Sequence, residues 1–403
     1  MYEDIRAARR PRNAPGASRW AEKFDLAAAE AALAFHQSFP EYAVTPLADL
    51  KNLAGMLGVA GIYVKDESHR FGLNAFKVLG GSHCLGRYIG RQLGGGLPDY
   101  AALVSPETRA RLGELTFVTA TDGNHGRGIA WTANRIGQKS VVYMPAGSAA
   151  ERLENIRALG ADASITDRNY DGAVRLASQR AEENGWILVQ DTTWPGYEEI
   201  PTWIMQGYTT MALEAVRQLG DTRPTHVFLQ AGVGAMAGAL TAFFVHYYGE
   251  NRPKIIVVEP DKADCFYRSA CAGEPRAVGG AMDTIMAGLA CGEPCTIAWD
   301  ILRAYADWFV SMPDWVAAQG MRVLGNPLGG DPCVVSGESG ASTAGLVTEL
   351  LRSPARAALR EQFGLDSASR ILCVSTEGDT DRRNYRGIVW DGAFARPAES
   401  GAK

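Results

Sequence analysis

The sequence predicts an α/β protein with two domains. Short apolar runs alternate with helical stretches over residues 115–190, and a second alternating block opens at residue 226. Alternation with short connections is typical of parallel strands joined by helices. The chain also has 403 residues, which is too long for a single domain with one ordinary hydrophobic core.

Composition argues against several other classes of protein. Hydrophobic residues make up 46% and charged residues 21%, as in ordinary globular proteins. The formal net charge of −5 and the lack of long basic runs argue against a nucleic-acid partner. No apolar run has the length of a membrane span, and residues 1–6 lack the apolar core of a signal peptide. We therefore expect a cytoplasmic enzyme or binding protein.

The first elements lead to a lysine loop. An alanine-rich stretch at 26–35 predicts a helix, and residues 46–50 lead into a helix that ends near Gly58. The apolar run 61–64 predicts a strand. A helix is expected at 78–93, where three consecutive glycines end it.

The alternating blocks follow. Apolar runs predict strands at 115–120, 140–144, 162–166, 186–190, 226–230, 254–258 and 370–375. Helices are expected at 126–136, 149–159, 171–184, 204–219, 235–248, 342–352 and 354–363.

The cysteines do not indicate the disulfide framework of a secreted protein, because they number seven and are scattered through a long chain. Four of them lie close in sequence, at Cys265, Cys271, Cys291 and Cys295. No histidine lies in that region, so no metal site is predicted. A disulfide within this group stays open.

Lys77 is the first candidate for chemistry. It lies after the strand at 61–64, at the start of a helix, between Phe76 and Val78. Apolar neighbours remove water from the amine and disfavour its charged form. A neutral amine can attack an aldehyde and hold it as a Schiff base. A single lysine is more often a surface residue in a turn, so this interpretation depends on the other motifs.

A second polar loop ends a predicted strand and opens a helix; it is Thr121-Asp122-Gly123-Asn124-His125-Gly126. Its backbone N–H groups and the positive end of the helix dipole suit a carboxylate. Asn124 can donate to a phenolate-like oxygen, and Asp122 can accept a proton. The structural alternative is that Asp122 only caps the helix.

A glycine-rich loop joins the strand at 226–230 to the next helix. Its small residues let the backbone wrap a phosphate at the helix N-terminus; they are Gly232, Val233, Gly234 and Ala235, followed by Met236. The glycine spacing departs from the dinucleotide fingerprint. Glu259 nevertheless ends the next strand where a ribose-binding acid is expected, so a Rossmann oxidoreductase that uses NAD stays open. Glycines that only permit close helix–sheet packing are the structural alternative.

Two further polar loops lie at strand ends. Ser375 ends the last predicted strand and Thr376 follows it, where a hydroxyl faces the usual ligand crevice of an open α/β fold. The other loop is Gln190-Asp191-Thr192-Thr193-Trp194. Together the loops supply an amine, a phosphate cradle, an amide and hydroxyl groups, which are the groups needed to hold pyridoxal 5'-phosphate.

At these residues the chain resembles the fold type II pyridoxal-phosphate enzymes, the tryptophan synthase β-like group. The run Asn74-Ala75-Phe76-Lys77 looks like the lysine motif of the group, 122–126 is similar to its asparagine loop and 232–238 to its phosphate loop. With 190–194 and 375–381 added, the motifs resemble those of the diaminopropionate ammonia-lyases within the group. Asp122 stands where dehydratases of the group usually have serine or threonine.

The resemblance covers roughly residues 35–391 and implies a homodimeric carbon–nitrogen lyase. It would convert D- and L-2,3-diaminopropionate to pyruvate and two ammonia by α,β-elimination. Lys77 would hold the cofactor and take the α-proton from one face, Asp122 would take it from the other, and Asp191 would bind the second amine or help protonate it. Substrate contacts are expected from Thr121, Asp122, His125 and Asp191. Cofactor contacts are expected from Lys77, Asn124, the residues from Gly232 to Met236, and Ser375 or Thr376 at the pyridine nitrogen.

We accordingly expect a large cofactor-binding domain of residues 1–85 and 222–403 and a small domain of residues 86–221. A serine or threonine dehydratase is the alternative within the same fold. The NAD-dependent oxidoreductase is the alternative from a different class.

Overall fold

The computed structural model describes residues 4–121 and 123–397, in two compact units. Unit 1 contains Met1–Ala21, Thr45–His69 and Glu214–Lys403. Unit 2 contains Glu22–Val44 and Arg70–Leu213. Each unit has its own sheet, so the chain carries two separate cores.

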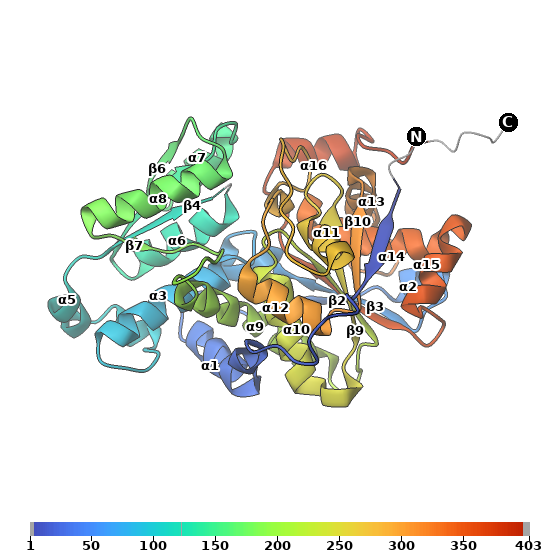
Figure 1. The fold of residues 1–403 in the computed structure, drawn as a ribbon, viewed down its shortest axis with the longest axis horizontal. Coiled ribbons are helices and arrows are strands. Elements are labelled where there is room, and N and C mark those ends of the chain that lie inside the picture. The colour runs from blue at the N-terminus through green and yellow to red at the C-terminus, as the bar shows by residue number, and fades with distance from the viewer. Residues whose placement is uncertain (1–3, 122, 398–403) are drawn as a thin grey trace. The chain divides into compact units, whose positions relative to one another are not determined.

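Unit 2 is built on a parallel sheet with the strand order β6–β5–β4–β7. Its strands are β4 (Thr116–Ala120), β5 (Lys139–Met144), β6 (Asp162–Ile165) and β7 (Ile187–Leu188). Its helices are α1 (Leu26–Gln37), α3 (Val78–Gln92), α4 (Tyr100–Leu103), α5 (Pro106–Leu112), α6 (Asn124–Arg135), α7 (Ala150–Arg157), α8 (Tyr170–Asn184) and most of α9 (Glu199–Leu219). Helix α8 packs on one face of the sheet and α6 on the other, with α3 outside α6 (Figure 1).

Local sequence explains where several of these helices begin and end. The Asp25 carboxylate accepts the N–H of Ala28 at the start of α1, and Asn169 accepts the N–H of Gly172 at the start of α8. These are ordinary N-caps, which satisfy donors that have no partner within the helix. Helix α8 ends at Gly185, whose φ of 67° is left-handed and favours glycine.

Unit 1 is built on a larger sheet with the strand order β1–β10–β9–β8–β11–β3–β2. Its strands are β1 (Arg6–Arg9), β2 (Leu47–Asp49), β3 (Gly61–Asp66), β8 (His226–Gln230), β9 (Lys254–Pro260), β10 (Trp308–Met312) and β11 (Arg370–Ser375). The inner strands are parallel, and the edge strands β1 and β2 run antiparallel to their neighbours. The inner strands are almost completely buried, as expected for a sheet covered on both faces.

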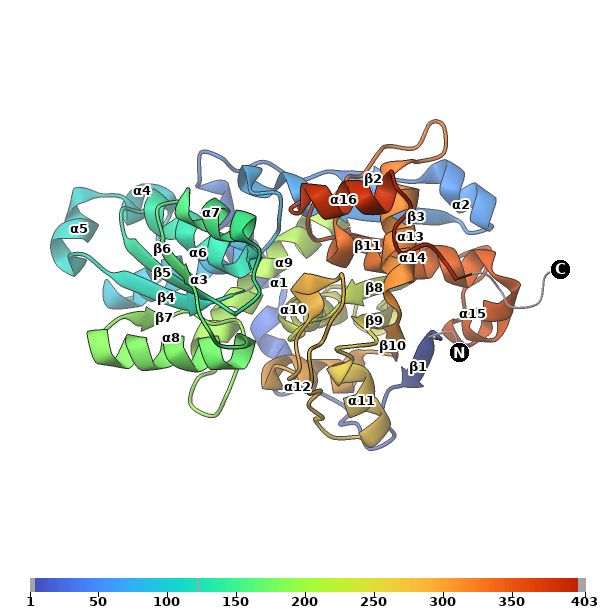
Figure 2. The same ribbon diagram turned by 90° about the horizontal axis from the view of Figure 1, so that it is seen from above.

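Helices cover both faces of this sheet. They are α2 (Lys51–Leu57), α10 (Ala235–Tyr248), α11 (Cys265–Ala272), α12 (Thr296–Tyr305), α13 (Asp314–Gly325), α14 (Glu338–Arg352), α15 (Ala357–Phe363) and α16 (Arg382–Val389). Helix α14 packs on β8 and β11, with α13 against it, while α10 and α12 lie on the opposite face (Figure 2).

The predicted fold class is confirmed: both units have mostly parallel sheets flanked by helices. The predicted strands and helices are all present, with ends that move by a few residues. Residues 47–49 form the edge strand β2, so the helix expected after residues 46–50 begins only at Lys51.

The division into units differs from the sequence-based domain boundaries. Residues 22–44 and 70–85 were placed in the large domain, whereas the structure groups them with unit 2. The physical reason is packing, because α3 contacts both α1 and α6. The assignment of cofactor binding to one domain stays a prediction.

Candidate active site

Lys77 immediately precedes α3 and forms an ion pair with Asp191. The lysine Nζ lies 2.5 Å from Oδ2 of Asp191. The lysine side chain is 20% exposed and that of the aspartate 4%. Phe76 and Val78, on either side of the lysine, are buried, as the sequence predicts. Removing one member of such a buried pair leaves an uncompensated charge, so the two side chains depend on each other.

His125 is the third member of this cluster. Its Nδ1 lies 4.0 Å from the same Asp191 oxygen, and its Nε2 donates to the carbonyl oxygen of Val189 at 2.9 Å. Burial raises the pKa of Asp191, but the electrostatic interactions with Lys77 and His125 and the hydrogen bond from Lys77 outweigh that effect and bring the pKa down to about 2. Asp191 is therefore a carboxylate at neutral pH, suited to hold a cation.

The segment that carries Asp191 is fixed by side chains that sequence reasoning missed. The Tyr197 hydroxyl accepts the N–H of Gln190 at 2.8 Å and donates to the carbonyl of Leu188 at 2.9 Å. The buried Gln190 side chain bonds both backbone groups of Ala120, at 3.0 and 3.1 Å. A glutamine at the end of an otherwise apolar strand was the signal, because a buried amide needs partners.

The loop after β4 contributes the other predicted residues of unit 2. The Thr121 hydroxyl accepts the N–H of Gly123 at 2.9 Å, and Asn124 and His125 open α6. Asp122 lies outside the described residues. The structure thus brings together Lys77, His125 and Asp191.

In unit 1 the glycine loop leads into α10. Gly234 precedes the helix with a left-handed φ of 86°, and a Cβ there would lie 2.2 Å from the Phe266 ring. A Cβ on Gly232 would lie 3.0 Å from the carbonyl oxygen of Gly288. No side chain caps the first N–H groups of α10. Glycine is therefore required here, and the helix N-terminus presents backbone donors suited to an anion.

Ser375 and Thr376 lie at the carboxyl end of β11, and both are buried. The Ser375 hydroxyl donates to Oγ of Ser336 at 2.8 Å, and Thr376 Oγ1 accepts from Nε2 of Gln230 at 3.1 Å. The Oε1 of Gln230 is buried and has no hydrogen-bond partner among the described residues. The sequence alone predicted no role for Gln230 or Ser336, and again the signal was a glutamine that ends an apolar strand.

Glu259 has a structural role that contradicts the NAD alternative. It is fully buried, and its carboxyl group accepts the N–H groups of Phe266 and Tyr267 at 2.8 and 2.7 Å, at the start of α11. Burial raises the pKa of Glu259 to about 8, although these hydrogen bonds oppose it. Both of its oxygens are occupied by backbone, so Glu259 is not poised to bind a ribose.

Comparison with known proteins now decides the family. The family model described as pyridoxal-phosphate dependent enzyme matches residues 39–376. The chain belongs to this family. A diaminopropionate ammonia-lyase from Salmonella typhimurium is 52% identical over 371 residues, which cover 90% of this chain and 92% of the relative.

Solved structures give the same family. The crystal structure of diaminopropionate ammonia lyase from Escherichia coli in complex with D-serine has a TM-score of 0.91 and 47% identity, and the match covers 98% of both chains. A second structure of that enzyme holds an aminoacrylate–PLP azomethine reaction intermediate; its TM-score is 0.89, with 47% identity and coverage of 98% of this chain and 99% of the other. Pyridoxal phosphate is therefore the cofactor to test against the residues of this chain.

The residues of this chain have the chemistry needed to bind pyridoxal phosphate, the cofactor of the family. Unit 2 offers a mostly buried amine beside a carboxylate. Unit 1 offers a helix N-terminus whose glycines a Cβ would crowd, and the buried Gln230 oxygen with no partner among the described residues. The amine suits the aldehyde of the cofactor, the helix N-terminus suits its phosphate, and the amide oxygen suits a polar donor.

Other kinds of site find no support within residues 4–121 and 123–397. No group of three or more histidine, cysteine, aspartate or glutamate side chains gathers there in a way that could hold a metal ion. No helix of that part is long and apolar enough to span a membrane. The cysteines in it form no disulfide.

Proposed function

We propose that this chain catalyses the pyridoxal-phosphate-dependent α,β-elimination of 2,3-diaminopropionate, in either hand, to pyruvate and two ammonia. The observation that carries the proposal is 52% identity over nearly the full length of an enzyme with that name. The buried cluster of Lys77, His125 and Asp191 supports it, because an amine and a fixed carboxylate suit a substrate with two amino groups.

We assign the cofactor contacts as follows. Lys77 holds the aldehyde carbon, and the loop from Gly232 to Met236 holds the phosphate. Asn124 donates to the phenolic oxygen. Ser375, with Thr376 as the second choice, meets the pyridine nitrogen. Because a hydroxyl holds that nitrogen less firmly protonated than a carboxylate does, this choice favours elimination over transamination.

The chemistry then needs two proton acceptors and one cation site. Bound pyridoxal phosphate withdraws electrons from the Cα of an amino acid joined to it. Lys77, once displaced by the substrate amine, takes the α-proton from one face, and Asp122 takes it from the other. The β-amine then leaves as ammonia, and water releases the second ammonia with pyruvate.

Asp191 is assigned to the second amine of the substrate. Its pKa of about 2 keeps it negative at neutral pH, which favours binding an ammonium group over donating a proton. When Lys77 is engaged elsewhere, the carboxylate loses its cation partner, and the β-ammonium group can replace it. We assign Thr121 and His125 to substrate contacts because the family resemblance implies them, and His125 lies 4.0 Å from Asp191.

A substrate comparison tests the proposal. Purified holoenzyme should release pyruvate from D- and L-diaminopropionate with a kcat/KM at least about a hundredfold above that for serine or threonine, since one buried ion pair supplies a discrimination of that order. A preference for serine or threonine would establish the dehydratase alternative instead.

Asp122→Asn tests the second proton acceptor. The variant should lose activity on one enantiomer at least about a hundredfold more than on the other, the size of a general-base contribution. Equal losses on both enantiomers would remove Asp122 from the role of stereospecific base.

We also propose that the enzyme is a cytoplasmic homodimer. The family resemblance supports the dimer, and the ordinary globular composition supports the location. Light scattering of the purified chain and cell fractionation test the two statements separately.

A further inference from the structure

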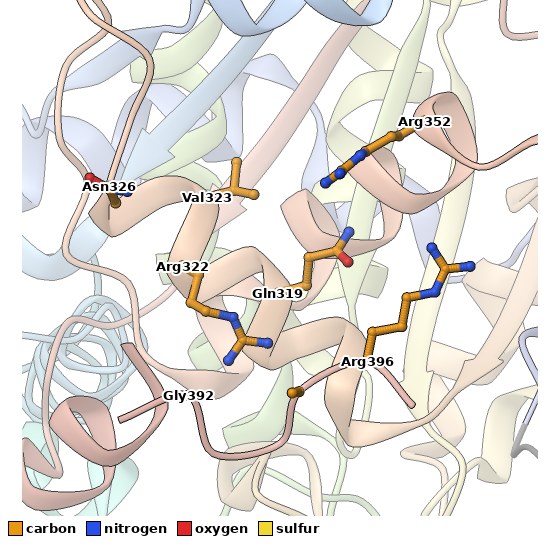
Figure 3. A pocket seen from close by; sticks show the side chains of 8 residues that line it. Gln319, Arg322, Val323, Asn326, Arg352, Gly392 and Arg396 are labelled. Atoms are coloured by element: carbon orange, nitrogen blue, oxygen red, sulfur yellow. The ribbon is translucent and has the colours of Figure 1, made fainter. Parts of the chain in front are cut away.

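A cavity of about 510 Å³ lies in unit 1, and none of the residues that line it is assigned to catalysis or to the cofactor (Figure 3). Helix α13 supplies one wall, the last residue of α14 another, and the segment after α16 a third. Its lining is rich in basic and amide side chains: Gln319, Arg322, Val323, Asn326, Arg352, Gly392, Ala395 and Arg396.

The positive charge around this cavity is only partly compensated. Within the described part of the chain, no carboxylate pairs with Arg352, and Arg322 donates to the backbone carbonyls of Ile388, Ala393 and Phe394. Arg396 pairs with the buried Glu349 at 3.2 Å. Glu349 also pairs with Arg356 at 3.5 Å, so this carboxylate is shared by two guanidinium groups. The lining of the cavity therefore carries positive charge, in a chain whose net charge is −5.

Gln319 supplies an independent sign that an acceptor is missing. Its amide nitrogen is buried and has no hydrogen-bond partner among the described residues. Figure 3 shows Arg352 extending toward this amide and Arg396 rising beside it, while Arg322 points toward the segment at Gly392. A buried donor without a partner destabilises the fold, so such groups usually have a ligand or ordered water.

We propose that this cavity binds a small phosphate monoester. One guanidinium group can donate two parallel hydrogen bonds to the oxygens of a phosphate. A phosphate monoester carries about two negative charges at neutral pH, which suits a cavity lined by arginines. The volume exceeds that of a single phosphate group, and Val323 and Ala395 give an apolar surface for the organic part of the ligand. The inference stands independently of the catalytic assignments.

Calorimetric titration of the cofactor-loaded, desalted enzyme with glycerol 3-phosphate tests the site. Cofactor loading fills the catalytic phosphate site, so the titration reports on any other. We expect saturable binding that weakens about tenfold in Arg352→Gln and in Gln319→Leu, the loss expected from one charge-assisted hydrogen bond. Arg175→Gln removes the same charge from an exposed position on α8 and should leave the affinity unchanged.

Two further titrants fix the ligand class. Glycerol should not bind, and inorganic phosphate should bind more weakly than the ester. The proposal is overturned if glycerol 3-phosphate does not bind, if it binds Arg352→Gln as well as the parent enzyme, or if inorganic phosphate binds as tightly as the ester.

Discussion

The two units contribute opposite kinds of chemistry. Unit 2 contains a cluster of ionisable side chains, in which Lys77 and His125 each lie within 4.0 Å of the Asp191 carboxylate. The predicted site of unit 1 is mostly neutral, with Gly232 and Gly234 before a helix N-terminus and Ser375 bonded to another hydroxyl. The charged side chains to which we assign proton transfer lie on one unit, and the backbone and hydroxyl groups proposed to hold an anion and a ring lie on the other.

This difference predicts that substitutions in the two units affect different properties of the enzyme. Buried charges support one another, so a change in unit 2 should alter reactivity and pH dependence. Glycine permits a backbone geometry that other residues adopt only with strain. A substitution in the unit 1 loop should therefore alter cofactor retention and stability. The following predictions test that contrast, beginning with the largest expected effect.

Lys77→Ala should lower kcat/KM at least about a thousandfold, because it removes both the covalent anchor and a proton acceptor. The visible absorption of the holoenzyme should disappear with it. Lys139→Ala, which changes an exposed lysine of the same unit, should leave both unchanged. A retained visible band in Lys77→Ala would assign the anchor to another residue.

Gly234→Ala should destabilise the chain by about 2–4 kcal/mol, through its left-handed backbone and the clash with Phe266. Its affinity for pyridoxal phosphate should fall as well. Urea unfolding and cofactor titration measure the two effects. Gly55→Ala is the matched control, because Gly55 lies within helix α2 and an added Cβ there would meet no other atom. This variant should stabilise the chain slightly.

The ion pair of Asp191 predicts a pH dependence. Its pKa is lowered to about 2, so the stability that it contributes is present above the ordinary aspartate pKa, near 4, and is lost as the pH falls toward 2. For the cofactor-free chain, the stability difference from Asp191→Asn should shrink by about 2 kcal/mol between pH 6 and pH 2. A difference that does not vary with pH would contradict the charged pair.

Tyr197→Phe should have the smallest effect, about 1–2 kcal/mol in unfolding free energy. The hydroxyl bonds the N–H of Gln190 and the carbonyl of Leu188, in the segment that leads to Asp191, so kcat should fall modestly while cofactor affinity holds. Tyr247→Phe, at a side chain 40% exposed, should change neither quantity.

Sequence pattern predicted the parallel strands well, because buried inner strands are continuous apolar runs. It missed the edge strands β1 and β2, which are short and pair on one side only. The strand β10 was also missed, although its buried run from Trp308 to Met312 is apolar enough to have been found.

The candidate site likewise contains residues that the sequence predicted and residues that it did not. Lys77, Asp191 and His125 were predicted from loops at strand ends and do meet in the structure. Their supports, such as Gln190 and Tyr197, were not predicted, because a polar side chain that bonds backbone leaves almost no pattern in sequence. Glu259 occupies the sequence position of a ribose-binding acid, and only the structure shows that it bonds the start of α11.

Reduction by borohydride, followed by peptide mapping, tests the central claim most directly. The yellow holoenzyme should bleach, and the pyridoxyl mass should appear on the peptide that contains Lys77 and on no other. A protein that binds no pyridoxal phosphate, or a label fixed on a different lysine, would contradict the account.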